Sequence, residues 1–137
     1  MKQTILIVED EPANQRLFRD LFESRGYAVI SATDGLQAVD MAMRQVPHLI
    51  LMDIGLPGVS GLDATRMIKA NESTGHIPVV ALTAFAMKED EDRASQAGCD
   101  GFLSKPVDIK VLLGEVARRL SSAESGLIMA ERSTPNG

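Results

Sequence analysis

Cysteine and long apolar runs are both scarce in this 137-residue sequence. Cys99 is the single cysteine, which excludes an intrachain disulfide and is compatible with a reducing compartment. No apolar stretch approaches the roughly 18 residues of a membrane span, and residues 1–4 lead directly into an apolar run, which leaves no room for a signal peptide. We therefore expect a cytoplasmic protein in which Cys99 is a packing residue.

Runs of positive charge are also missing. The 14 Lys and Arg residues are scattered and are outnumbered by 19 Asp and Glu residues, giving a net charge of -5. This balance favours neither nucleic acid nor an anionic membrane surface as a partner. The length and the 45% content of hydrophobic residues suit one domain with a single core. A second, DNA-binding output domain is therefore not expected.

Five short apolar runs alternate with amphipathic segments along the chain. Each run is continuous rather than alternating, which is typical of strands that are covered on both faces in a parallel sheet. The pattern predicts an α/β fold with an open, doubly wound, five-stranded parallel sheet of (βα)5 type. The five predicted strands are 5–9, 27–32, 48–53, 78–84 and 101–105.

The segments between the runs are predicted helices. The first, 14–26, carries its apolar stripe on Leu17, Phe18, Leu21 and Phe22 and ends at Gly26, a favourable C-terminal cap. The second carries Leu36, Val39 and Met43 at helical spacing. A helix at about 87–98 is highly charged and offers mainly Ala94 and Ala97 to a core, so it should shift at low cost.

The last predicted helix has the clearest apolar rhythm, from Ile109 to Leu120. After Leu120 the rhythm fails, and Leu127 to Met129 form one small apolar patch among Ser, Glu and Gly. We therefore expect a domain at 1–121 and a flexible C-terminal tail at 122–137. A docking peptide within this tail is the alternative interpretation.

Polar residues end four of the predicted strands. Glu9 and Asp10 end the first strand, Asp53 the third, Thr83 the fourth and Lys105 the fifth. Right-handed crossovers place the carboxyl ends of all strands at one edge of the sheet, where ligands of such folds bind. Three carboxylates and one ammonium leave a formal charge of -2, which matches a divalent cation, and Mg²⁺ prefers such hard oxygen ligands.

Three acids, a metal and a lysine suit phosphoryl transfer, in which positioning and charge neutralisation supply most of the catalysis. A carboxylate that acts as the nucleophile would form an acyl phosphate. Asp53 is the best candidate because it follows the most apolar run, LILM, which should hold it rigidly. Glu9 and Asp10 are adjacent and are better suited to hold the metal.

The blocks ILIVEDEP, LILMDIGLPGVSG, VVALTA and FLSKP, in this order and spacing, resemble a response-regulator receiver domain over residues 4 to about 121. The resemblance implies a flavodoxin-like sheet with strand order 2-1-3-4-5. LILMDI and HIPVVALTAFAMK also resemble single-domain regulators of bacterial cell-cycle and polarity control. Such a protein would be a phosphorylation-controlled binding module rather than an enzyme, although it would assist its own phosphotransfer and dephosphorylation.

The resemblance also implies a role for each site residue. Asp53 would accept a phosphoryl group from a histidine kinase or a phosphotransfer protein. Mg²⁺ would be held by Asp10, Asp53 and the Gly55 backbone carbonyl, with Glu9 acting directly or through water. Thr83 and Lys105 would bind the phosphoryl oxygens, Phe102 would be the aromatic switch residue, and Ala84 and Pro106 would support them, with Lys105–Pro106 as a cis peptide bond.

The implied output is protein binding. The surface of the fourth helix, the fifth strand and the last helix would bind a downstream protein target, with the chain a monomer or a weak dimer. Gly55 departs from the family pattern, which has a bulkier residue there to control water access, and Phe85 is the candidate to shield the phosphoryl group instead. The lifetime of the phosphorylated state is therefore open.

Three other functions fit parts of the pattern. A magnesium-dependent phosphohydrolase or nuclease could use the same acids, although a haloacid-dehalogenase-like enzyme needs D-x-D where this chain has E-D-E. A flavodoxin-type cofactor protein would share the topology but needs a phosphate-binding loop where DEPANQ places acids. A receiver that acts as a scaffold without phosphorylation would not need the complete set of acids, Thr and Lys.

Overall fold

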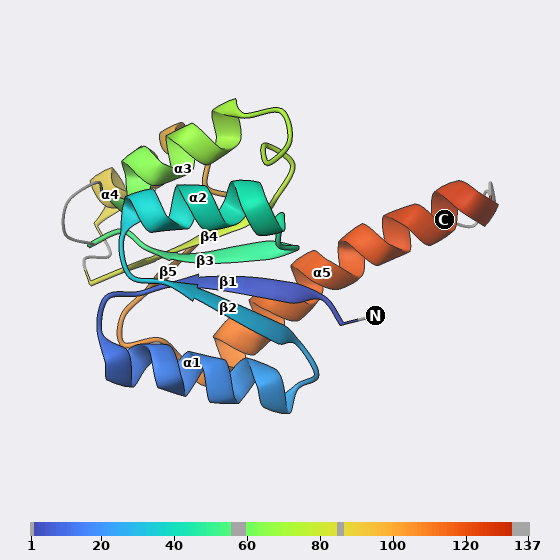
Figure 1. Ribbon diagram of the computed structural model, residues 1–137, viewed down its shortest axis with the longest axis horizontal. Helices are drawn as coiled ribbons and strands as arrows, with labels where there is room; N and C mark the ends of the chain where they lie inside the picture. Colours follow the sequence, from blue (N-terminus) through green and yellow to red (C-terminus); the bar gives the residue numbers. More distant parts are fainter. Residues whose placement is uncertain (1, 56–59, 85–86, 133–137) are drawn as a thin grey trace. The chain divides into compact units, whose positions relative to one another are not determined.

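Five short strands pair into one parallel sheet in the computed structural model, which describes residues 2–55, 60–84 and 87–132, with side chains up to residue 121. The strand order is β2-β1-β3-β4-β5, and every neighbouring pair is parallel (Figure 1). The predicted α/β fold class and strand order are thus confirmed. The strands are β1 Thr4–Val8, β2 Ala28–Ala32, β3 Leu49–Asp53, β4 Val79–Thr83 and β5 Gly101–Ser104.

Four helices belong to the same unit as the sheet, which extends to Val107. Figure 1 shows α1 on one face of the sheet and α2 and α3 on the other. After α1, Gly26 takes a left-handed conformation with φ +91°, as expected for a glycine that ends a helix. The helices are α1 Pro12–Ser24, α2 Gly35–Gln45, α3 Gly61–Ala70 and α4 Lys88–Ala97.

The central strands are apolar along their length because both of their faces are covered. Every residue of β3 and β4 is buried. On the face of α2 and α3, alternate residues of β1 and β3 form the core with small residues of the two helices. This cluster includes Leu6, Val8, Ile50, Met52, Ala38, Ala42, Ala64 and Ile68.

The predicted apolar stripes of the first two helices are partly wrong. Leu36 is 60% exposed and Met43 is 40% exposed, while α2 buries Gly35, Ala38 and Ala42. In α1, Phe18 and Phe22 are buried as predicted, but Leu17 is 53% exposed. Alanine and glycine let a helix lie close to its neighbours, so the small residues face the core and the larger ones turn outward.

The α4 helix is as weakly anchored as its charged sequence predicted. Its buried residues are Ala94 and Ala97. Its first turn carries Glu89, Asp90 and Glu91, which the N-terminal end of the helix dipole favours. Burying two alanines removes little apolar surface from water, so this helix contributes little to the stability of the fold.

The helix α5, Ile109–Arg132, lies in a second unit, Asp108–Gly137, which we describe by itself. Leu112, Val116 and Leu120 are buried as predicted, whereas Ile109, at the start of the predicted stripe, is 37% exposed. The backbone stays helical through 122–132, beyond the point where the sequence pattern fails. Extending an existing helix costs less than starting one, so weak apolar periodicity does not end it. The division into a domain at 1–121 and a tail at 122–137 stays a prediction.

Across the described ranges, we find no helix with both the length and the apolar character that a membrane span requires.

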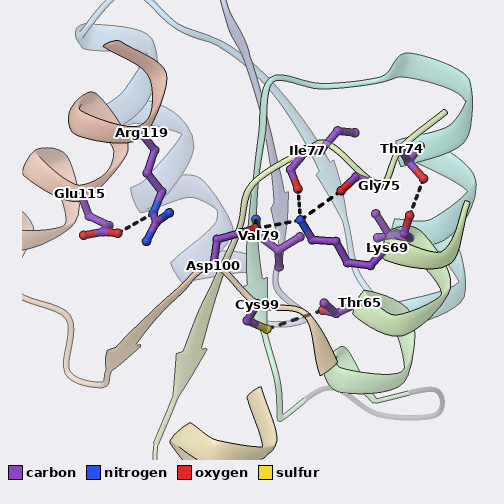
Figure 2. A network of polar contacts seen from close by, with 11 residues as sticks. Thr65, Lys69, Thr74, Gly75, Ile77, Val79, Cys99, Asp100, Glu115 and Arg119 are labelled. Atoms are coloured by element: carbon purple, nitrogen blue, oxygen red, sulfur yellow. Dashed lines mark hydrogen bonds and ion pairs between the residues drawn. The ribbon is translucent and has the colours of Figure 1, made fainter. Parts of the chain in front are cut away.

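A polar network joins the amino-terminal ends of β4 and β5 to α3 (Figure 2). Lys69 Nζ lies 2.8 Å from Asp100 Oδ2 and also donates to the carbonyls of Ile77, at 2.7 Å, and Gly75, at 3.4 Å. The Val79 backbone N–H donates to the same Asp100 oxygen at 2.8 Å. One ammonium and one carboxylate thereby fix the loop after α3 against the starts of two strands.

Cys99 lies beside this network and packs against the core. Its Sγ is 4.0 Å from Thr65 Oγ1 (Figure 2). Burial raises the pKa of the Cys99 thiol, and the contact with Thr65 offsets only part of that rise. A thiol in this setting is a poor nucleophile, which agrees with the packing role predicted from sequence.

Candidate functional site

Three carboxylates from two strand ends meet at the carboxyl edge of the sheet. One oxygen from each of Glu9, Asp10 and Asp53 lies within 4.8 Å of the other two. Glu9 is 2% exposed and Asp53 is 4% exposed, whereas Asp10 is open to solvent. The positions of these acids at strand ends predicted that they would meet. Their like charges therefore lie close together in a partly desolvated position.

Asp53 is held from both sides of its carboxylate. Its Oδ1 accepts a hydrogen bond from the Gly55 backbone N–H at 2.9 Å, and its Oδ2 accepts one from Lys105 Nζ at 2.9 Å. The start of α3 closes against the same strand end, since a Cβ on Gly61 would lie 2.5 Å from the Asp53 carbonyl oxygen. Only glycine permits that approach, so Gly61 helps to fix the backbone of Asp53.

Lys105 links the fifth strand to the acids. Its Nζ is 2.9 Å from Asp53 and 3.7 Å from Glu9 Oε1. Burial alone would lower the pKa of this ammonium, but the hydrogen bond and charge of Asp53, together with Glu9 and Asp10, raise it. Lys105 therefore stays protonated at neutral pH. Its peptide bond to Pro106 is cis, as the resemblance implied.

Glu9 is a buried acid with few hydrogen-bond donors around it. Its Oε2 accepts a hydrogen bond from the Glu11 backbone N–H at 3.1 Å, and Asn14 Nδ2 lies 3.4 Å from its Oε1. Burial is the main cause that raises the pKa of Glu9, and the nearby charge of Asp53 adds to it, while the Glu11 N–H and Lys105 act against it. The site thus holds negative charge that its own donors do not fully balance.

The acids open into a cleft of about 510 Å³. Of the predicted site residues, Glu9, Asp10, Asp53, Gly55, Thr83, Ala84 and Lys105 all line it. Phe102 does not line this cleft. It lies on β5 and lines a second cavity, of about 210 Å³, with residues of α4 that include Glu91 and Ala94. Pro106 lies next to Lys105 in sequence and is exposed.

Several residues of the cleft wall were not predicted from the sequence. The omitted residues are Glu11, Ile54, Leu62, Asp90 and Arg93. Asp90 and Arg93 are one helical turn apart on α4, and that spacing was the available signal. It could not be used, because the sequence does not say which face of α4 turns toward the strand ends. Phe85, the candidate shield, lies outside the described residues.

The donor set of the cleft fits a hard divalent cation. Carboxylate oxygens are the preferred protein ligands of Mg²⁺, and three of them converge here from Glu9, Asp10 and Asp53. Burial, and to a lesser degree the charge of Asp53, raises the pKa of Glu9, and a bound cation would favour its charged form. The cluster can therefore hold a metal ion.

A family model for the response regulator receiver domain matches residues 5–117. The chain belongs to this family. It is the receiver domain of a two-component response regulator, a class of signalling module that interacts with histidine kinases and downstream targets.

Curated relatives agree with the family model. The chain is 47% identical over 123 residues to the polar-differentiation response regulator DivK of Brucella ovis, a match that covers 90% of this chain and 100% of the relative. The DivK protein of Brucella anthropi is 46% identical over the same share of both chains. The chain is therefore similar to DivK response regulators over most of its own length and over the whole of theirs.

Solved structures show the same fold. The receiver domain of a sensor histidine kinase from Pseudomonas aeruginosa PAO1, which has a magnesium ion coordinated in its active-site cleft, is 40% identical, with a TM-score of 0.82 over 88% of this chain and 99% of that one. The chemotaxis protein CheY4 of Vibrio cholerae is 23% identical with a TM-score of 0.83, over 88% of this chain and 100% of that one. The second likeness shows the fold alone.

Proposed function

We propose that this receiver domain accepts a phosphoryl group on Asp53 from a histidine kinase or a histidine phosphotransfer protein in a Mg²⁺-dependent reaction. One observation carries the proposal. The Asp53 carboxylate is 4% exposed, lies in a three-acid cluster and is paired with Lys105 at 2.9 Å, at the wall of an open cleft. A buried but reachable carboxylate beside a fixed cation is what a phosphoryl acceptor requires.

The transfer follows from these positions. A carboxylate oxygen of Asp53 attacks the phosphorus of a phosphohistidine whose other ring nitrogen is protonated, a P–O bond forms, and the P–N bond breaks with its electron pair going to the imidazole. The product is an acyl phosphate on Asp53 and a neutral histidine. Lys105, which stays protonated, balances charge on the transferred oxygens, and the Gly55 N–H keeps the carboxylate oriented.

Magnesium would supply further charge neutralisation when bound. Asp10, Asp53 and the backbone carbonyl of Gly55 would hold it, with Glu9 acting directly or through water. The support is the convergence of three carboxylates within 4.8 Å and the coordinated magnesium ion of the 40% identical receiver domain. Ala84 lines the same cleft and Pro106 follows Lys105, and both support the residues that hold the phosphoryl group.

Phosphorylation would switch a protein-binding surface. The Thr83 hydroxyl would bind the new phosphoryl oxygens, and Phe102 would move with it. The support is that α4 buries only small residues and that a cavity of about 210 Å³ lies beside Phe102 between α4 and β5. A weakly anchored helix beside free volume shifts at low cost. The readout surface is α4 with β5, and the contribution of α5 stays a prediction.

We also propose that the chain is not an enzyme and acts in the cytoplasm as a monomer or weak dimer on a protein target. Its free cysteine is compatible with that compartment. The DivK relatives are named for polar differentiation, which supports a role in cell polarity and the cell cycle. No nucleic acid or membrane partner is proposed, since the net charge is -5.

Phosphotransfer profiling tests the proposal. Purified histidine kinases and phosphotransfer proteins of the source organism would be labelled on histidine with ³²P and mixed briefly with the chain and Mg²⁺. We expect rapid transfer from a small subset of donors, a hydroxylamine-sensitive label, and no label on Asp53→Asn. A wild-type chain that no donor labels, or a label that survives Asp53→Asn, would overturn the proposal.

A further inference from the structure

The charge of the cleft wall does not suit an anionic substrate. Five carboxylates and two cations line the cleft, which leaves a formal surplus of three negative charges. A phosphoryl donor is itself an anion, so it must enter against this field. One divalent cation would still leave a surplus of one negative charge. The approach of the donor therefore depends on the two cations of the wall, Lys105 and Arg93.

Lys105 is already engaged. It pairs with Asp53 at 2.9 Å and with Glu9 at 3.7 Å, and its side chain is 28% exposed. Neighbouring carboxylates therefore neutralise much of its positive charge before a phosphoryl donor arrives. It is well placed to hold the phosphoryl group after transfer, but it is poorly placed to attract a donor from solution.

Arg93 is in the opposite situation. It is exposed at the cleft wall on α4, and within residues 2–55, 60–84 and 87–132 no ion pair or hydrogen bond engages its side chain. A guanidinium presents a planar fork of donors that matches phosphate oxygens two at a time. The long side chain and the weak anchoring of α4 let the fork adjust to a ligand.

We propose that Arg93 binds the phosphoryl oxygens of the incoming donor and is a second phosphoryl-contacting cation of this site. The proposal rests on the proposed function, since it assumes that Asp53 is the acceptor. Arg93 acts on the donor before transfer, whereas Lys105 remains with Asp53. This division follows from which of the two cations is already paired.

Acetyl phosphate is the probe for the test. The full chain and its variants would be incubated with saturating Mg²⁺ and several concentrations of acetyl phosphate, and intact-mass spectrometry would follow the initial rate of adduct formation. The matched control is Lys88→Gln, which also removes one positive charge from α4 but from an exposed residue outside the cleft wall. Arg93→Lys retains the charge without the fork.

We expect Arg93→Gln to lower the initial rate at low acetyl phosphate about threefold to tenfold, with Arg93→Lys in between and Lys88→Gln close to the wild type. If Arg93→Gln and Lys88→Gln behave alike, the inference fails while the proposed function stands. A wild-type chain that forms no adduct at Asp53 would overturn both.

A second readout does not depend on turnover. In an Asp53→Asn background, which cannot accept the group, adding acetyl phosphate with Mg²⁺ should shift the ¹H–¹⁵N signal of Arg93 Nε, assigned by its loss in Arg93→Gln. An unchanged Arg93 signal at concentrations that shift the Lys105 ammonium would contradict a direct contact.

Discussion

Two lysine–aspartate pairs of nearly equal length lie at opposite edges of the sheet. At the amino-terminal edge, Lys69 Nζ is 2.8 Å from Asp100, and at the carboxyl edge, Lys105 Nζ is 2.9 Å from Asp53. Their surroundings differ. Lys69 also donates to two backbone carbonyls, and Asp100 also accepts from a backbone N–H, whereas Lys105 faces a second buried carboxylate, Glu9.

We call the Lys69–Asp100 pair saturated, because neutral backbone groups complete its hydrogen bonds, and the Lys105–Asp53 pair unsaturated, because a further carboxylate faces its lysine. Neutral carbonyls accept the remaining hydrogen bonds of Lys69 without adding charge. The network of Lys69 and Asp100 therefore has a structural role (Figure 2). At the other edge, three acids lie around one lysine whose side chain is 28% exposed, and the pKa of Glu9 rises as a consequence of burial and of Asp53. Distance alone does not separate the two roles; the charge balance around each pair does.

The largest expected effect is on the unsaturated pair. Asp53→Asn should abolish phosphorylation, because an amide cannot form the acyl phosphate. The same change should leave the free energy of unfolding without metal unchanged to within about 1 kcal/mol, or raise it, since it removes one of three repelling carboxylates. Denaturant unfolding and phosphorylation assays check the two halves. A loss of several kcal/mol would mean that Asp53 is a structural residue after all.

The saturated pair should behave in the reverse way. Lys69→Met keeps the aliphatic stem but removes three hydrogen bonds and leaves Asp100 without its ammonium, so we expect a loss of about 2 to 3 kcal/mol in the free energy of unfolding. The rate of phosphorylation should stay within about twofold, since the change lies at the opposite edge.

Arg66→Met is the matched control for this loss. The Arg66–Asp63 pair has the same 2.8 Å distance on the same helix, but its side chains are 52% and 58% exposed. An exposed pair contributes less than about 1 kcal/mol. Equal losses from Lys69→Met and Arg66→Met would show that the Lys69 network is an ordinary surface pair.

Magnesium should stabilise the folded protein only by binding at the carboxyl edge of the sheet. At a concentration tenfold above its Kd, an ion that binds the folded state adds about 1.4 kcal/mol to the free energy of unfolding. We expect this increment in the wild type and in Lys69→Met, and its near loss in Asp10→Asn, as measured by thermal unfolding with and without Mg²⁺. An increment that Asp10→Asn retains would place the ion elsewhere.

The smallest expected effect is a pH dependence of the metal-free protein. Burial raises the pKa of Glu9 in the folded state above its usual value, so the folded protein binds this proton more tightly than the unfolded chain does. The stability from this proton is present at low pH and is lost as the pH rises through the folded pKa. The contribution of Glu9 should therefore rise by less than about 1 kcal/mol between pH 7 and 5.

Urea unfolding in the presence of a chelator, at pH 7 and pH 5, measures this contribution. Glu9→Gln cannot titrate, so the difference between the wild type and this variant isolates the group. A wild type that loses stability relative to Glu9→Gln on acidification would reverse the sign and contradict the raised pKa.

Most of the fold followed from the strands. Continuous apolar runs such as LILM predict buried parallel strands, and the structure buries all of β3 and β4. The buried faces of the helices were harder to predict. In α2, either Leu36 and Met43 or Ala38 and Ala42 could face the core, and only the close packing of the helix decides which pair does so. The extension of α5 past Leu120 was missed, since helix propagation does not need an apolar pattern.

The residues of the site also divide into those that could be predicted from the sequence and those that could not. Glu9, Asp10, Asp53 and Lys105 could be predicted to meet because sheet topology alone brings strand ends together. Arg93 could not be predicted, since its position depends on the rotation of α4, which few core contacts fix. The Lys69–Asp100 pair joins residues 31 apart, at strand starts that carried no motif.

Peptide-mapped mass spectrometry after incubation with acetyl phosphate, in Mg²⁺ and separately in a chelator, tests the central claim most directly. We predict one adduct of about 80 Da, the mass of a phosphoryl group replacing a proton, located on Asp53, formed by the wild type and by Lys69→Met only when Mg²⁺ is present. An adduct on another residue, or one that forms equally well in the chelator, would contradict the account.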